Sequence, residues 1–177
     1  KELSLKTYTD EIVFGEKTLA SALVDSLGNF SFHFELDSTA TCFIEIGSYH
    51  GLFFVEPGKN YAIELPPFKP MTKAENFNPY FKPEKFFLKI KNGDETGLNS
   101  MIVSFEDAFN YYYVKSALSQ NVDTIKAYIS EIQKLYPDTS IQFFQDYKDY
   151  KYALMTNLNE KYSPDWAISS YVSKTPV

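Results

Sequence analysis

The spacing of apolar residues changes once along the chain, and this change constrains the fold more than any other feature. Over residues 1–92 apolar and polar residues alternate with a period of two, and glycines and prolines separate the runs. Residues 94–177 contain a single glycine, Gly97, and their apolar residues recur every three or four positions. A period of two is typical of half-buried strands, and the longer period is typical of amphipathic helices. The sequence therefore predicts an α+β chain with a β domain over 1–92 and a helical region over 94–177.

The clearest predicted strand is 30–36, in which Phe30, Phe32, Phe34 and Leu36 alternate with polar residues. A turn at 25–29 is expected to join it to 18–25 as a hairpin. Further strands are predicted at 2–9, 42–46, 51–56, 60–65 and 86–90, with a type II turn at Pro57-Gly58. About seven short strands with turns at this spacing favour an antiparallel β-sandwich.

The connection 66–83 contains five prolines, at positions 66, 67, 70, 79 and 83. Such a segment is expected to be extended and irregular. Its aromatic residues favour burial, so it is predicted to wrap over the sandwich with these side chains covered: Phe68, Phe77, Tyr80 and Phe81.

Three to four helices are predicted in the second half. The first has an apolar face made by Leu98, Ile102, Phe105, Phe109 and Tyr112. Asp123 is the expected N-cap of a second helix, with Ile125, Ile129, Ile132 and Leu135 inward. A third is expected to open at Asp138 or Thr139, with Ile141, Phe144, Tyr147, Leu154 and Leu158 inward. Ser163-Pro164 predicts a fourth helix over 165–173, and we interpret the helical region as truncated at its C-terminal end.

The charge composition argues against several function classes. The net charge is −6, and all 17 basic residues are lysine. A chain with this balance has little general attraction to phosphate backbones or anionic lipid, so nucleic acid is not an expected partner. Without arginine there is no bidentate guanidinium clamp for phosphate or carboxylate. No apolar run reaches the ~18 residues that cross a bilayer, so no transmembrane segment is predicted.

The single cysteine, Cys42, excludes an internal disulfide, a paired-thiol redox motif and a cysteine zinc site. It shares a strand face with Ile44 and Ile46, so we interpret it as a small apolar filler rather than a nucleophile. The chain starts at Lys1 without an apolar signal segment. We interpret it as a trimmed piece, with any export signal or lipid anchor upstream.

Few residues suggest a catalytic or metal-binding role. His33 and His50, with Glu35 or Glu45, would form a metal site if neighbouring strands brought them together. The strand pattern instead places His33 and Glu35 toward solvent and His50 in a loop, which favours surface histidines. No catalytic, cofactor-binding or metal residue is therefore predicted, and no cofactor.

Three other groups of residues remain as weaker candidates. A pair of carboxylates would suit a glycoside hydrolase, but Glu95, Glu106 and Asp107 are interpreted as a solvated stretch near a helix start. The tyrosines at 111–113 surround a helix, so at least one must leave the core face. These rings would either bind sugar or a partner, or, as we favour, seal a domain boundary. Asn29-Phe30-Ser31 matches a glycosylation acceptor, although the turn already explains Asn29.

Three segments resemble one family. Val24-Asp25-Ser26-Leu27-Gly28-Asn29-Phe30-Ser31-Phe32 is similar to the D-x-x-G-x-F-x-F hairpin in the amino-terminal sandwich of Bacteroidetes cell-envelope proteins. Phe54-Val55-Glu56-Pro57-Gly58-Lys59-Asn60-Tyr61 resembles the PG turn of that domain. Asn78-Pro79-Tyr80-Phe81, Leu98-Asn99 and Phe109-Asn110 resemble the helical segment that follows it. The sandwich is also similar in fold to transthyretin-like accessory domains.

In that family the region commonly precedes a thioredoxin-like domain with thiol-disulfide oxidoreductase activity, exported and often lipid-anchored. Its redox residues are a Cys-x-x-Cys pair that no position here matches, so no catalytic residue is transferred. The resemblance implies a non-catalytic accessory or interaction region in the cell envelope, periplasmic or anchored to the outer membrane. A protein partner or downstream domain is expected. The alternatives are a glycan- or peptide-binding module that uses exposed tyrosines and, third, a hydrolase.

Overall fold

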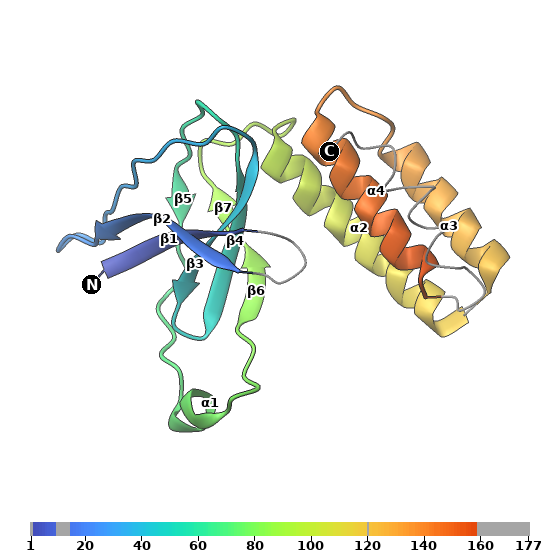
Figure 1. The fold of residues 1–177 in the computed structure, drawn as a ribbon. Helices are drawn as coiled ribbons and strands as arrows, with labels where there is room; N and C mark the ends of the chain where they lie inside the picture. The colour runs from blue at the N-terminus through green and yellow to red at the C-terminus, as the bar shows by residue number, and fades with distance from the viewer. Residues whose placement is uncertain (1, 10–14, 120, 159–177) are drawn as a thin grey trace. The chain divides into compact units, whose positions relative to one another are not determined.

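The computed structural model describes residues 2–9, 15–119 and 121–158 (Figure 1). The chain forms two compact units, Lys1–Asp94 and Glu95–Val177. The first unit holds the strands and the second holds the long helices, so the fold class is α+β.

The first unit is built on a mixed five-stranded sheet in the order β2-β1-β3-β4-β6 (Figure 1). Its strands are β1 (Glu2–Tyr8), β2 (Glu16–Leu23), β3 (Ala40–Ile46), β4 (Tyr49–Val55) and β6 (Glu84–Phe87). The pairs are antiparallel except β4 with β6, which is parallel. The prediction of a purely antiparallel arrangement is therefore wrong. The physical reason is the long connection after β4, which returns the chain to the same end of the sheet as a parallel crossover requires.

One face of this sheet carries the core of the unit. Strand alternation puts every second residue on this face, which is what the period of two predicted. Gly51 leaves room there for Leu88, because a Cβ at position 51 would lie 2.6 Å from a Leu88 methyl carbon. The buried members of the cluster are Leu3, Leu5, Cys42, Ile44, Ile46, Phe53, Val55 and Leu88.

The chain that packs against this core is less regular than the sequence predicts. A small second sheet pairs β5 (Ile63–Glu64) with β7 (Lys89–Ile90). The segment 30–36 is extended and half-buries its alternate apolar residues, yet it forms no strand with the other described residues. The predicted seven-stranded sandwich is thus not confirmed. Alternation requires only that an extended chain lie over a core, whereas a strand also needs a neighbouring backbone to pair with.

The predicted hairpin between 18–25 and 30–36 is wrong, because β2 pairs with β1 instead. The turn itself is present. The Asp25 carboxylate accepts hydrogen bonds from the backbone N–H groups of Leu27 and Asn29, each at 2.8 Å, and Gly28 has a φ of 88°. The turn chemistry was therefore readable from the sequence, but the strand partner was not.

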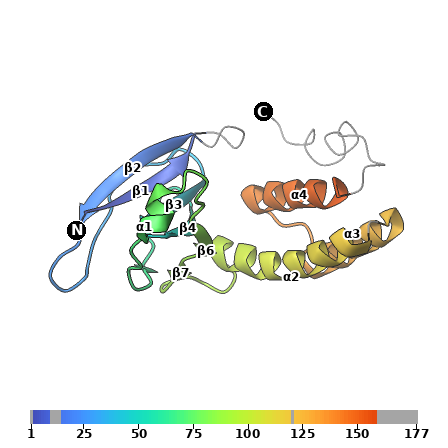
Figure 2. The same cartoon turned by 90° about the horizontal axis from the view of Figure 1, so that it is seen from below.

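The described residues of the second unit form three helices that contact one another pairwise: α2 (Leu98–Ser119), α3 (Val122–Leu135) and α4 (Gln142–Thr156) (Figure 2). Phe105 is fully buried among them and contacts the rings of Phe109, Tyr136, Phe144, Tyr147 and Tyr152. The predicted inward residues of α2 from Leu98 to Phe109 are buried. In α3 the three isoleucines are buried, whereas Leu135 is exposed.

Two helix starts differ from their predictions. The N-cap of α3 is Asn121, whose side-chain oxygen accepts from the N–H groups of Asp123 and Thr124, at 2.9 and 3.1 Å. Asp123 is therefore in the first turn, where its charge also suits the helix dipole. Helix α4 begins after Ile141, which has no side-chain capping bond. The fourth helix predicted at 165–173 lies outside the described residues.

Candidate binding groove

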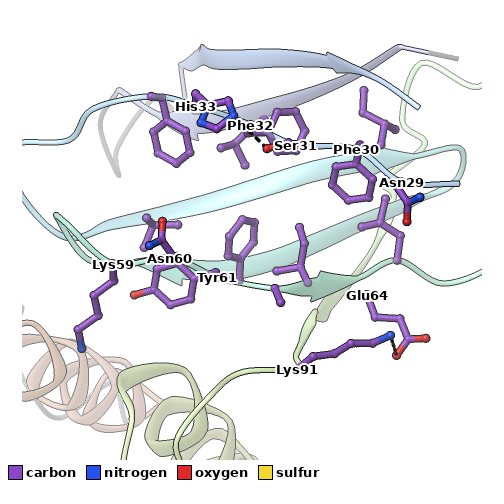
Figure 3. A pocket seen from close by; sticks show the side chains of 18 of the residues that line it. Asn29, Phe30, Ser31, Phe32, His33, Lys59, Asn60, Tyr61, Glu64 and Lys91 are labelled. Carbon is purple, nitrogen blue, oxygen red and sulfur yellow. Dashed lines mark hydrogen bonds and ion pairs between the residues drawn. The ribbon is translucent and has the colours of Figure 1, made fainter. Parts of the chain in front are cut away.

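A groove of about 1760 Å³ lies over the core face of the five-stranded sheet (Figure 3). Its floor is apolar and comes from β1, β3 and β4: Leu3, Leu5, Ile46, Phe53 and Val55. These side chains are buried, and alternation along the paired strands places them together on the core face.

Two extended stretches of chain form the walls of the groove. Segment 30–36 contributes Phe30, Phe32 and Phe34, and the stretch around β5 contributes Tyr61 and Ile63. The apolar residues of both stretches are half-buried against the core. Figure 3 shows the two stretches on opposite sides of the sheet strands that form the floor.

The wall at 30–36 has unpaired backbone. No residue in this segment forms a backbone–backbone hydrogen bond with another described residue. Its polar side chains bond locally, as in the 3.1 Å contact between the Ser31 hydroxyl and His33 Nε2. Extended backbone with free N–H and C=O groups is a template for another strand.

Charged groups surround the groove and leave it acidic. The Lys59 ammonium donates to Glu56 at 2.8 Å, and Lys91 lies 3.5 Å from Glu64. Among the lining residues Glu35 and Asp37 have no ion pair to any described residue, and Asp25 is used in its turn. Two lysines thus face five carboxylates along the lining.

The Tyr61 hydroxyl in the groove wall and the Cys42 thiol in the core below are poor nucleophiles at neutral pH. Burial raises the pKa of the Tyr61 hydroxyl to about 12, and this group donates to the Glu56 carboxylate at 3.1 Å. Burial likewise raises the pKa of the Cys42 thiol to about 12, which leaves almost no thiolate at neutral pH. The prediction that Cys42 faces inward is confirmed, since its side chain is fully buried.

The pKa of Cys42 predicts a loss of stability in alkali. The ordinary value is 9.0, so above pH 9 the unfolded chain loses the thiol proton while the folded chain keeps it. The free energy of unfolding should therefore fall as the pH rises from 9 to 12, by about 2 kcal/mol at a pH of about 10.5. Urea unfolding of the parent and of Cys42→Ala, each at about pH 9 and at about pH 10.5, measures this loss of stability. Equal losses in the two proteins would show that the thiol is not protected by burial.

The structure brings together two of the four candidate metal-ligating residues, His50 and Glu45, but not His33 and Glu35 with them. His33 is exposed, as predicted, and Glu35 is also exposed on its segment. His50 is the exception to the surface interpretation: it lies within β4, is 8% exposed, and stacks on Phe43 at 5.2 Å. Its Nε2 lies 3.3 Å from the Glu45 carboxylate, directly across the β3–β4 pair. In the described ranges no cluster of three or more metal-ligating side chains occurs.

Glu106 differs from its predicted place in a solvated stretch. It is buried, and its carboxylate accepts hydrogen bonds from the Tyr147 hydroxyl and the Lys151 ammonium, while Glu95 and Asp107 are exposed. A helix can bury a residue of this kind when the facing helix supplies donors. The Glu106 carboxylate is thus held by structural contacts.

The tyrosines at 111–113 do not form an open shelf. Tyr111 is exposed, but the Lys115 ammonium lies 4.0 Å from its ring centroid. Tyr112 packs against Tyr128 of α3, with ring centroids 5.2 Å apart. Asn29, of the glycosylation match, is exposed in its turn and donates to the Asp25 carboxylate.

Comparison with known protein families, curated proteins and solved structures finds no match to this chain. In the described part of the chain, no helix has the length and apolar character needed to span a bilayer.

Proposed function

We propose that the chain is a non-catalytic interaction region whose groove holds an extended peptide segment. The observation that carries the proposal is the unpaired backbone of 30–36 beside an apolar floor. A peptide that pairs with this edge gains main-chain hydrogen bonds, and its alternate side chains enter the groove. Such strand addition is a common mode of peptide recognition.

The size of the groove favours a peptide over a compact small molecule. Pockets for small ligands usually have volumes of ~300–1,000 Å³, whereas this groove measures about 1760 Å³. It also follows an extended stretch of seven residues, 30–36, rather than closing around a point. A row of several side chains from one strand would fill such a space.

The charges of the lining favour a peptide with alternate apolar residues and lysine on the outward positions. Glu35 and Asp37 are exposed at one end of the segment and are free to pair with ammonium groups. Exposed ion pairs contribute little affinity, about 0–1 kcal/mol each. They would chiefly set the direction and register of the peptide.

A bound strand would also complete the second layer of the first unit. We propose that 30–36 then becomes a regular strand and that the unit approaches the transthyretin-like sandwich expected from the sequence. The setting is likewise proposed: an exported bacterial envelope protein in which a thioredoxin-like domain follows this region. That setting is supported by the sequence resemblance alone.

The test uses a fluorescent peptide of alternating valine and lysine, measured by anisotropy against the whole chain. A matched peptide is N-methylated on alternate residues, which removes the N–H donors of one edge. The unmodified peptide should bind, and the methylated peptide should bind at least tenfold more weakly, since each net hydrogen bond contributes about 0.5–1.5 kcal/mol. Phe32→Asp should weaken binding of the unmodified peptide, and Leu118→Ser, an exposed site on α2, should not. Equal affinity for both peptides would contradict strand addition.

A further inference from the structure

The connection 66–83 exposes apolar side chains that the sequence predicts to be covered. Phe77 is 85% exposed and Tyr80 is 86% exposed, and Phe68 and Met71 are also exposed. Isolated exposed apolar residues are ordinary, but four within thirteen positions of one loop are an unusual concentration of exposed apolar surface. Figure 1 shows this loop extending beyond the strands of the sheet, with α1 (Lys73–Phe77) at its far end.

These exposed residues lie in a loop that its own hydrogen bonds order. The N-cap of α1 is Thr72, whose hydroxyl accepts from the Glu75 N–H, while the Glu75 carboxylate accepts from the Thr72 N–H at 2.6 Å. This capping box fixes the start of the helix. Beyond it, the Asn78 side-chain oxygen accepts from the Tyr80 N–H at 3.0 Å. The loop therefore holds Phe77 and Tyr80 outward through its own hydrogen bonds.

The base of the loop is attached to the sheet. The Ser48 N–H donates to the Lys69 carbonyl at 3.0 Å, and the Glu84 N–H donates to the Ser48 carbonyl at 3.1 Å. Gly47 forms a bridge with Lys69 in the same place. A loop held at both ends presents its tip in a defined direction from the first unit.

The charge of the loop is opposite to that of the chain. Residues 66–83 contain Lys69, Lys73 and Lys82, all exposed, and one acid, Glu75. That acid is engaged in the capping box. The loop thus carries a net +2 within a chain of net charge −6.

We propose that this loop contacts an anionic lipid surface. Phenylalanine and tyrosine rings favour the boundary between lipid headgroups and acyl chains. Lysines near the surface are attracted to anionic headgroups. The apolar residues extend from a narrow loop, which suits a soft surface, whereas a standard protein interface buries about 800 Å² on each partner. The binding would be peripheral and would not require a membrane-spanning helix.

The test is co-sedimentation of the whole chain with vesicles of phosphatidylcholine and phosphatidylglycerol in equal parts, at low salt. The parent should sediment with these vesicles and much less with phosphatidylcholine alone. Phe77→Ser with Tyr80→Ser should lower the partition coefficient by about tenfold or more, because two rings lose apolar contact. Lys73→Gln and Lys82→Gln should each lower it by about fivefold.

The control is Leu27→Ser, which removes an apolar residue 85% exposed in a different turn and should leave partition unchanged. Melting temperatures of all the variants should match the parent, since none of these side chains is buried. If the parent does not sediment, or if the double variant sediments as well as the parent, the proposal is overturned.

Discussion

Phe105→Ala is expected to lower the free energy of unfolding of the helical unit by about 3–5 kcal/mol. The side chain is fully buried, and its ring contacts five other aromatic rings with centroids 5.4 to 6.2 Å away. Truncation removes the transfer energy of the ring and leaves a cavity that rigid neighbouring rings cannot easily fill. Each edge-to-face contact adds to the loss.

The measurement is urea unfolding followed by circular dichroism at 222 nm. Leu118→Ala on the same helix is the control, because Leu118 is 83% exposed and its loss should change stability by about 0.5 kcal/mol or less. A Phe105→Ala variant that unfolds at the same urea concentration as Leu118→Ala would show that the aromatic cluster is not the core of the unit.

Gly47→Ala is expected to have the second large effect, about 3 kcal/mol or more. Gly47 has a φ of 64°, and a Cβ there would lie 1.8 Å from the Lys69 carbonyl oxygen. The new methyl group must therefore displace the backbone that attaches the 66–83 connection to the β3–β4 turn. Thermal unfolding of the first unit measures the loss.

Gly58→Ala separates the backbone strain from the steric clash. Gly58 has a φ of 74° in the predicted type II turn, but no heavy atom lies within 4 Å of its Cβ position. Gly58→Ala should lower the free energy of unfolding by only about 1–2 kcal/mol, because alanine disfavours the left-handed backbone conformation. If both variants lose the same stability, the close contact of Gly47 with Lys69 is not maintained in solution.

The two periodicities predicted which residues face inward better than they predicted which strands pair. Alternation reports burial, and it correctly indicates that Phe30, Phe32 and Phe34 turn toward a core. Strand pairing depends on the path of distant segments. The sequence around residues 30–36 does not indicate that β2 pairs with β1 rather than with this segment. The groove follows from that missing pair, so it could not be predicted from the sequence.

The burial of a charged residue in α4 could not be predicted from the sequence either. Lys148 is 1% exposed, and its ammonium donates to the carbonyls of Tyr136 and Pro137 at 3.0 and 2.8 Å. Desolvation lowers the pKa of this group. Hydropathy places any lysine outside, so the predicted inward face of this helix omits Lys148 and comprises Ile141, Phe144, Tyr147, Leu154 and Leu158. Phe144 is buried as predicted, whereas Tyr147 and Leu154 are only half-buried and Lys148 and Tyr152 are among the buried residues. The carbonyls that satisfy Lys148 lie directly after the end of α3, and only the folded structure brings them close.

Hydrogen–deuterium exchange of the backbone amides at 30–36 tests the proposed strand addition most directly. In the free protein these amides should exchange at nearly unprotected rates, while those of β3 and β4 are protected, because only the latter have strand partners. Addition of the valine–lysine peptide should slow exchange at alternate residues of 30–36, since one edge of a strand uses every second N–H. Strong protection of this segment in the free protein, or no change on adding the peptide, would contradict the proposed function.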